Sequence, residues 1–134
     1  MLPGGSSGAD DAMLSRIGAA VDEHDVAMYT KAGCGYCSRA TVLLQQQQDA
    51  AGFSLSSAIG TDDETRAALG QALSLASVTF PVVIIRGVYV GGADELTELV
   101  DQGQLSALLH ATRVPFRSGA VPRSKALQRL EVSL

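Results

Sequence analysis

Residues 26–37 of this 134-residue chain read Val-Ala-Met-Tyr-Thr-Lys-Ala-Gly-Cys-Gly-Tyr-Cys. The apolar run 26–30 predicts a short buried strand, 31–33 a loop, and the residues from about Tyr36 to Gln48 favour a helix. Cys34 and Cys37, the two cysteines of the chain, therefore stand between a strand and a helix. Two thiols at this spacing can close a small disulfide or act as soft metal ligands.

The segments on either side alternate between helical and extended patterns. Helices are predicted from Asp10 or Asp11 to about Val21, from the capping box Thr61/Glu64 to about Leu73, over 94–100 and over 105–109, and strands over 53–57, 81–85 and 88–90. A βαβ unit followed by a β-hairpin and a helix predicts a small α/β sandwich, whose first two strands are parallel.

Length and composition indicate one compact domain with loose ends. With 46% hydrophobic and 18% charged residues, the chain suits a single domain, which we expect over residues 11–112. The Gly- and Ser-rich residues 1–10 are expected to be disordered. No apolar run approaches the roughly 20 residues of a bilayer span, and the first residues do not resemble a secretory signal. We therefore expect a cytoplasmic protein with no membrane partner, although an organellar protein would look the same after its transit peptide is removed.

Charge is divided unevenly along the chain. Residues 1–112 carry five basic and thirteen acidic side chains (net −8), whereas residues 113–134 carry five basic and one acidic (net +4). A basic tail of this kind can dock on an acidic surface or on nucleic acid. Because its basic residues are spread out and Phe116 is its one aromatic residue, we expect a flexible extension over 113–134 and no nucleic-acid partner.

The position of Cys34 predicts a reactive thiolate. This residue precedes a helix, where unpaired backbone N–H groups and the helix dipole stabilise an anion. Lys31 adds a nearby positive charge, and both effects lower the pKa of the Cys34 thiol towards neutrality. Cys37 lies one turn further into the helix and is placed to resolve a mixed disulfide formed at Cys34. Since His24 and His110 have no ligand-like spacing to the cysteines, redox chemistry is favoured over a zinc site.

Three ordered motifs carry a resemblance to a known family. They are Lys31-Ala32-Gly33-Cys34-Gly35-Tyr36-Cys37, Thr79-Phe80-Pro81 and Gly91-Gly92-Ala93-Asp94-Glu95-Leu96. In this order they resemble the K-x-G-C-P-Y-C, T-V-P and G-G-x-D-D-L motifs of the glutaredoxins, over residues from about Val21 to Leu109. The resemblance implies a thioredoxin-like α/β sandwich, with a four-stranded mixed sheet flanked by helices.

The same resemblance implies a glutathione site. In the family the peptide bond before the motif proline is cis, which corresponds to Phe80-Pro81 here, and the backbone beside it pairs with the cysteine of glutathione. Lys31 would meet the glycyl carboxylate, and Asp94 would accept from the α-ammonium while helix N–H groups take the α-carboxylate. The implied glutathione-binding residues are Lys31, Tyr36, Thr79, Phe80, Pro81, Gly92, Ala93 and Asp94, with Cys34 and Cys37 as the catalytic pair.

Two positions depart from the family pattern. The family often has a basic or amide residue just before the motif threonine, where this chain has Ser77-Val78, so Arg66 or Gln71 would have to supply that contact. Gly35 stands where dithiol members commonly have proline. In the family, Gly or Ser at this place is associated with a [2Fe-2S] cluster, held between two protomers by Cys34 of each chain and two glutathione thiolates.

Three functions are consistent with these observations. The leading hypothesis is a monomeric, glutathione-dependent thiol–disulfide oxidoreductase that reduces protein–glutathione mixed disulfides and protein disulfides through Cys34. The second is a cluster-bridged homodimer that acts as an iron–sulfur carrier or redox sensor, with Cys34 as the metal ligand. The third is an electron donor fed by thioredoxin reductase, against which Lys31, Tyr36 and Asp94 argue because they suit glutathione.

Overall fold

The computed structural model describes residues 11–125, 127 and 128, so the disorder predicted for residues 1–10 lies outside the described part. The elements are α1 (Asp11–Glu23), β1 (Val26–Thr30), α2 (Gly35–Ala51), β2 (Leu55–Ile59), α3 (Asp63–Leu73), β3 (Val82–Ile85), β4 (Val88–Gly91), α4 (Ala93–Asp101) and α5 (Gln104–His110). Within the described part, no helix combines the length and apolar character needed to cross a membrane.

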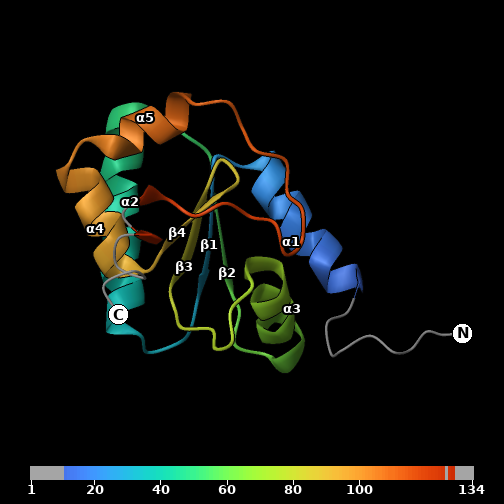
Figure 1. The fold of residues 1–134 in the computed structure, drawn as a ribbon. Helices are drawn as coiled ribbons and strands as arrows, with labels where there is room; N and C mark the ends of the chain where they lie inside the picture. Colours follow the sequence, from blue (N-terminus) through green and yellow to red (C-terminus); the bar gives the residue numbers. More distant parts are fainter. Residues whose placement is uncertain (1–10, 126, 129–134) are drawn as a thin grey trace, which may run out of the picture.

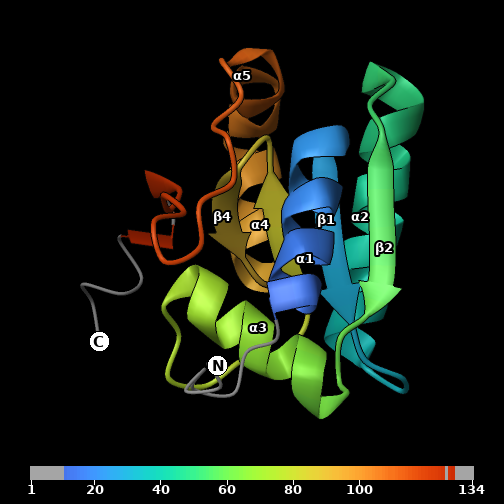
Figure 2. The same ribbon diagram turned by 90° about the vertical axis from the view of Figure 1, so that its right-hand side faces the viewer.

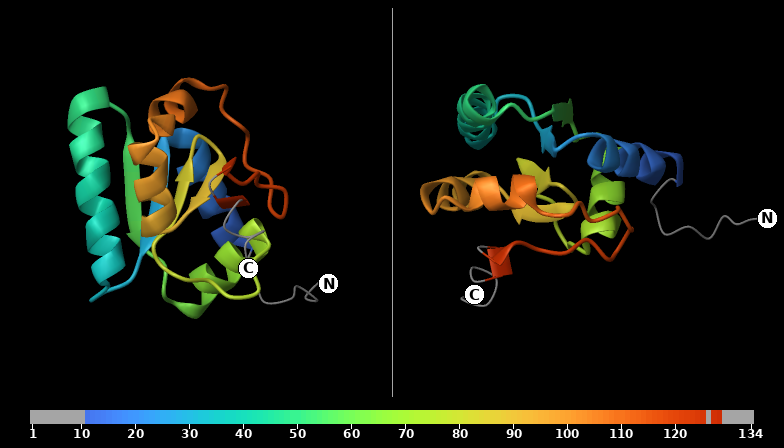
Figure 3. Two further views of the ribbon diagram at one scale, coloured as in Figure 1. Left: turned by 60° about the vertical axis from the view of Figure 1, so that its left-hand side comes forward. Right: turned by 90° about the horizontal axis from the view of Figure 1, so that it is seen from above.

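The four strands form one mixed sheet in the order β2-β1-β3-β4. β1 and β2 are parallel, as predicted, whereas β3 runs antiparallel to both β1 and β4. The hairpin between β3 and β4 turns at Arg86-Gly87, where both residues have positive φ, as a type I′ turn requires. Helices α2 and α4 cover one face of the sheet, and α1 and α3 cover the other (Figures 1 and 3). These features confirm the thioredoxin-like sandwich.

Two apolar layers hold the sheet between its helices. Because successive strand residues point to opposite faces, Val26 and Met28 of β1 pack with α2 and α4, while Ala27 and Tyr29 pack with α1 and α3. Burial removes Tyr29 from water and raises the pKa of its hydroxyl. The sheet is therefore buried on both sides over β1 and β3, which explains the continuous apolar runs in the sequence.

The strand directions bring three loops to one edge of the sheet. β1 ends where β3 begins, since Tyr29 pairs with Val82, and β4 ends at the same edge, since Gly91 pairs with Val83. The loop after β1, the loop before β3 and the turn after β4 therefore meet. Helices α2 and α4 both begin at this edge, so their unpaired backbone N–H groups face the same region.

Two predicted boundaries are shifted in the structure. The second strand covers 55–59 instead of 53–57, because Phe53 is buried in the core and Ser54 is held by the Asp25 carboxylate. The N-cap of α3 is Asp62 and not Thr61. Its carboxylate accepts from the backbone N–H of Thr65 at 3.0 Å and from its hydroxyl at 2.8 Å, and these bonds hold the pKa of Asp62 below its usual value.

The C-terminal segment, defined here as residues 113–128, differs most from expectation. The sequence predicts a flexible extension, yet the described residues of this segment pack along the domain, from α1 to the free edge of β4 (Figures 1 and 2). The Arg113 guanidinium donates to the carbonyls of Val21 and His24 at 2.7 and 2.8 Å. The positive charge of Arg113 thus lies at the C-terminal end of α1, where the helix dipole favours a cation.

Asp25 joins this segment to the sheet. Its carboxylate lies 2.8 Å from Nη1 of Arg86 and 3.3 Å from Nη2 of Arg113, and it accepts from the backbone N–H of Ser54 at 3.1 Å. The hydrogen bonds from Ser54, together with the hydrogen bond and the positive charge of Arg86, lower the pKa of Asp25. One carboxylate therefore connects the start of β1, the approach to β2, the β3–β4 turn and the C-terminal segment.

Two residues of the C-terminal segment, Val114 and Phe116, pack into space left by glycines. Phe116 lies on α1 at Gly18, where a Cβ would come within 2.8 Å of the phenylalanine ring. Gly87 has a φ of 88°, and the carbonyl oxygen of Val114 occupies the space where a side chain would stand. Both glycines therefore make room for residues of the C-terminal segment.

Candidate active site

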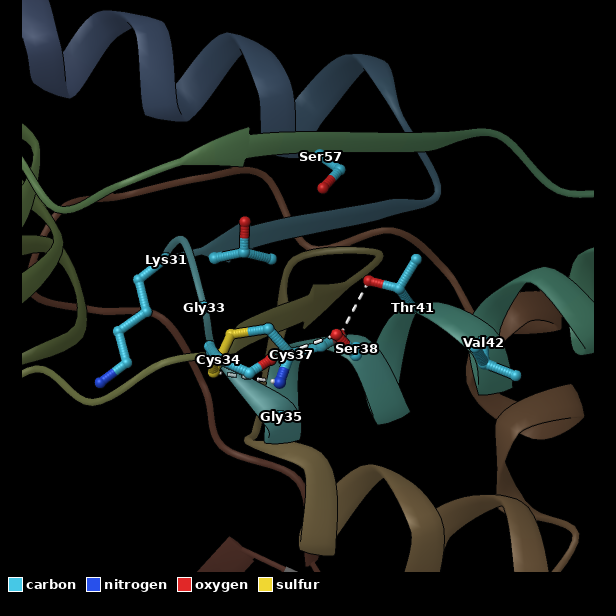
Figure 4. A pocket seen from close by; sticks show the side chains of 10 residues that line it. Lys31, Gly33, Cys34, Gly35, Cys37, Ser38, Thr41, Val42 and Ser57 are labelled. Atoms are coloured by element: carbon cyan, nitrogen blue, oxygen red, sulfur yellow. Dashed lines mark hydrogen bonds between the residues drawn. A yellow bond between two sulfur atoms is a disulfide. The ribbon is translucent and has the colours of Figure 1, made fainter.

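Cys34 and Cys37 form a disulfide at the start of α2, with their Cα atoms 5.2 Å apart (Figure 4). Cys34 is the N-cap of the helix, and its Sγ accepts from the backbone N–H of Cys37 at 3.1 Å. The same N–H group and the helix dipole favour a thiolate on Cys34 once the disulfide is reduced. Both cysteines are buried in this oxidised state, with 9% of Cys34 and 4% of Cys37 exposed. They differ in position, because Cys34 is the N-cap of α2 and Cys37 lies within its first turn.

The loop before β3 faces this disulfide. The Phe80-Pro81 peptide bond is cis, as the resemblance implies, and Sγ of Cys34 lies 3.9 Å from the carbonyl oxygen of Phe80. The backbone on either side of Pro81 is therefore within reach of a ligand whose sulfur sits at Cys34.

A groove of about 390 Å³ extends from this loop to the start of α4. Seven residues that the resemblance implies in glutathione binding line this groove, and they are Tyr36, Thr79, Phe80, Pro81, Gly92, Ala93 and Asp94. They come from three separate segments that meet at one edge of the sheet. The groove is also lined by three residues without a predicted role, namely Tyr89, Glu95 and Leu127.

The eighth implied residue, Lys31, lines a second pocket on the other side of the disulfide. This pocket of about 620 Å³ lies between α2 and β2 and is bounded by Cys34, Cys37, Thr41 and Ser57 (Figure 4). Figure 4 shows the Lys31 side chain beside the disulfide. Lys31 thus lines the same pocket as Cys34, and no residue from the start of α4 lines that pocket.

Asp94 has a partner that the sequence does not reveal. Its carboxylate lies 3.6 Å from Nη2 of Arg39, and the Arg39 guanidinium also lies over the ring of Tyr36, 5.4 Å from its centre. Both charged side chains are largely exposed, so this ion pair contributes little to stability. The ion pair links the N-terminal part of α2 to the first turn of α4, which carries groove residues.

The start of α4 is fixed by a neighbouring carboxylate. Glu95 accepts from the backbone N–H of Gly92 at 2.6 Å, which satisfies one of the unpaired donors at the helix start. Asp94 and Glu95 both stand in the first turn of α4, where the helix dipole favours negative charge. The two adjacent acids thus have different tasks, since Glu95 holds the backbone while Asp94 remains exposed at the groove.

The sequence predicts Arg66 or Gln71 as the substitute for the basic or amide residue missing before Thr79. The Arg66 guanidinium lies over the ring of Phe80, 5.5 Å from its centre, so Arg66 contacts a residue of the groove. Gln71 and Arg66 both line a separate pocket of about 560 Å³, next to Ser77 and Val78. Arg66 is therefore the better placed of the two.

Several groove residues could not be found from sequence motifs. Arg39, which pairs with Asp94 of the groove, lies two residues after Cys37 on α2, and the approach of α4 brings this carboxylate partner near. Tyr89 reads as a strand residue, and Leu127 lies outside the three motifs. The histidines play no part here, since Nδ1 of His110 contacts the Ser106 carbonyl within α5, and His24 lies in the turn before β1.

A thioredoxin-like sandwich, with a C-x-x-C disulfide at a helix start and a cis-proline loop facing it, defines a class of thiol–disulfide oxidoreductases. The family model described as glutaredoxin matches residues 26–90 of this chain. The chain is 33% identical over 87 residues to glutaredoxin 1 of Rickettsia bellii, covering 64% of this chain and 87% of that protein. The chain belongs to the glutaredoxin family.

Two further comparisons agree with this assignment. A glutaredoxin of Pseudomonas aeruginosa is 41% identical over 86 residues, which cover 64% of this chain and 96% of that protein. Among solved structures, a buckwheat glutaredoxin–glutathione complex has a TM-score of 0.59 and 27% sequence identity. That match covers 73% of this chain and 87% of the buckwheat chain.

Proposed function

We propose that this glutaredoxin reduces protein–glutathione mixed disulfides, with Cys34 as the nucleophile. The observation that carries the proposal is the position of the Cys34 sulfur. It accepts from the Cys37 N–H at 3.1 Å and lies 3.9 Å from the carbonyl oxygen of Phe80, a residue that lines the groove built from the three motifs. A thiolate held there is stabilised by the helix start and is adjacent to the space where a tripeptide thiol would bind.

The proposed reaction balances in two thiol–disulfide exchanges. The Cys34 thiolate attacks the glutathione sulfur of the mixed disulfide, the protein thiolate leaves, and Cys34 becomes glutathionylated. A second glutathione thiolate then attacks the bound glutathione sulfur. Oxidised glutathione leaves, and the Cys34 thiolate is regenerated.

Cys37 takes part when the substrate is a protein disulfide. In that case Cys34 forms a mixed disulfide with one substrate cysteine, and the other substrate thiol leaves. The Cys37 thiolate then attacks Cys34 and releases the second substrate thiol, which produces the intramolecular disulfide present in the structure. Glutathione subsequently reduces this disulfide.

The proposed glutathione pose follows from the charges around the groove. The ligand sulfur lies at Cys34, its backbone pairs beside Pro81, and its α-ammonium and α-carboxylate lie at Asp94 and at the N–H groups of the α4 start. Lys31 and Arg66 are the cations available to the glycyl carboxylate. A buckwheat relative of similar fold has been solved as a glutathione complex, which supports this choice of ligand.

Two single substitutions test the proposal. Cys34→Ser should reduce the rate of deglutathionylation of a test peptide by at least about a thousandfold, because no other thiol at the groove can form the intermediate. Cys37→Ser, the matched control in the same helical turn, should retain most of that activity and lose reduction of protein disulfides. An active Cys34→Ser variant would contradict the proposal.

The reductant is tested with the unmodified protein. Glutathione with glutathione reductase should reduce the Cys34–Cys37 disulfide, and thioredoxin reductase with NADPH should not. The opposite result would favour the electron-donor hypothesis over glutathione dependence.

Gly35 supports a second candidate function, binding of a [2Fe-2S] cluster. Apart from its chain neighbours and the backbone of its own helix, no heavy atom lies within 4 Å of the position that a Gly35 side chain would take, so the space beside Cys34 is open to a bulky group. The described residues include no group of three or more metal-ligating side chains, so Cys34 would be one protein ligand per chain and other thiolates would complete the set. Visible absorbance and glutathione-dependent dimerisation after anaerobic purification would support cluster binding, and a colourless monomer after reconstitution would contradict it.

A further inference from the structure

The C-terminal segment supplies a wall of the groove. Its residue Arg123 forms a parallel bridge with Tyr89 of β4, so the chain after Arg123 runs towards the same sheet edge at which β4 ends. Leu127, four residues later, lines the groove together with Thr79, Gly92 and Asp94. The segment lies beyond residues 26–90, which the glutaredoxin family model matches.

The position of Leu127 is fixed by a chain of contacts. The backbone N–H of Tyr89 donates to the Pro122 carbonyl at 2.8 Å, and the Ser124 N–H donates to the Tyr89 carbonyl at 2.9 Å. The buried hydroxyl of Ser124 accepts from the Leu127 N–H at 3.2 Å. Leu127 itself is 9% exposed. Its side chain is therefore packed, and it does not swing freely at the mouth of the groove.

The order of segments along the sheet edge shows which end of the groove Leu127 closes. Cys34 follows β1, Pro81 precedes β3, Gly92 follows β4, and the C-terminal segment lies beside β4 on the outer side (Figure 2). A ligand with its sulfur at Cys34 that extends past Pro81 and Asp94 would next meet Leu127. This apolar wall offers no hydrogen bond to a longer ligand.

We infer that Leu127 is a specificity-determining residue that limits the length of the thiol ligand at its amino end. The inference rests on the proposed glutathione-dependent function. A tripeptide thiol with a free γ-glutamyl amino group fits between Cys34 and Leu127. A tripeptide thiol that carries a bulky acyl group on that nitrogen is excluded by the leucine side chain.

The test compares two substrates across matched variants. The two substrates are mixed disulfides of the same peptide. One carries glutathione, and the other carries glutathione benzoylated on the α-amino group of its γ-glutamyl residue. Wild type should prefer the free amine, and Leu127→Ala should reduce that preference about tenfold, mainly through a lower KM for the benzoylated substrate. Acylation also removes the ammonium partner of Asp94, but this loss is common to all variants and cancels when their preferences are compared.

Val121→Ala is the matched control, because Val121 is a similarly buried residue of the same segment that does not line the groove. Val121→Ala should leave the preference for glutathione over the benzoylated substrate unchanged. Leu127→Met should retain the wild-type preference because methionine and leucine have similar volumes. If Leu127→Ala does not fold, Leu127→Phe should increase the preference by narrowing the groove.

An unchanged preference in a folded Leu127→Ala variant overturns the inference, as does an equal shift in Val121→Ala, which would indicate a loosened segment. Absence of preference in wild type also overturns it. If wild type reduces neither glutathione substrate but reduces a protein disulfide with another reductant, the proposed function has failed instead.

Discussion

The loop around Cys34 and the C-terminal segment reach the same groove by different means. Residues 31–37 are held mainly by near neighbours, as when Cys34 accepts from the N–H of a residue three positions later. Residues 113–128 are held by partners far away in sequence, including Val21, Asp25 and Tyr89. We therefore expect changes in the first region to alter chemistry, and changes in the anchors of the second to alter stability.

The largest stability effect should come from the carboxylate that joins both ends of the chain. Asp25→Ala leaves two half-buried guanidinium groups, Arg86 and Arg113, without their carboxylate, and it removes an acceptor for the Ser54 N–H. We expect the free energy of unfolding to fall by about 2–3 kcal/mol in chemical denaturation. The rate of disulfide reduction per folded molecule should change little.

Asp49→Ala on the exposed side of α2 is the control for charge removal, and it should cost less than about 0.5 kcal/mol. Equal losses of stability in the Asp25 and Asp49 variants would contradict the proposed anchoring of the C-terminal segment.

The packing of Phe116 on α1 predicts that Gly18→Ala lowers the free energy of unfolding in wild type and raises it when the Phe116 ring is absent. In wild type, Gly18→Ala should be destabilising by about 1–2 kcal/mol, because its Cβ would come within 2.8 Å of the Phe116 ring. In a Phe116→Ala background the same change should stabilise the protein by up to about 1 kcal/mol, since alanine favours helix over glycine. Thermal unfolding of the four proteins measures this coupling, and an equal effect of Gly18→Ala in both backgrounds would indicate that Phe116 does not pack there.

A local contact provides the contrasting case. Asp62→Ala removes the side-chain acceptor at the start of α3 and should measurably lower the free energy of unfolding. Thr61→Ala, the residue that the sequence suggested as the cap, should change the free energy of unfolding by less than about 0.5 kcal/mol. Urea denaturation of the two variants distinguishes the positions, and a larger loss in Thr61→Ala would restore the capping box.

The smallest expected effect is the loss of the stability contribution of Asp25 at acidic pH. Because the hydrogen bonds from Ser54 and Arg86 lower the pKa of Asp25 in the folded state, its carboxylate contributes stability above the pKa of the unfolded chain. That contribution is lost as the pH falls through the lowered folded-state pKa. The difference in unfolding free energy between wild type and Asp25→Asn should be constant from about pH 6 to pH 8 and should shrink below about pH 4. A difference that stays constant into acid would show that the charge of Asp25 is irrelevant.

Much of the fold was predictable because its signals are local. The apolar run 26–30, the turn at Arg86-Gly87 and the order of helices and strands predicted a mixed α/β sandwich, which the structure confirms. Errors occurred where a tertiary contact outweighs a local pattern. The β2 strand begins later than predicted because Ser54 is engaged by Asp25, which lies 29 residues earlier.

The site divides in the same way. The sequence by itself determined the cysteine pair, the helix start that favours a thiolate on Cys34, and the motifs around Pro81 and Gly92, because each of these depends on neighbouring residues. The tertiary structure alone decided that Arg39 pairs with Asp94 and that Leu127 closes the groove. These residues lie far apart in the sequence, since Arg39 and Asp94 are 55 positions apart. They depend on how α4 and the C-terminal segment pack against the sheet, which no local pattern records.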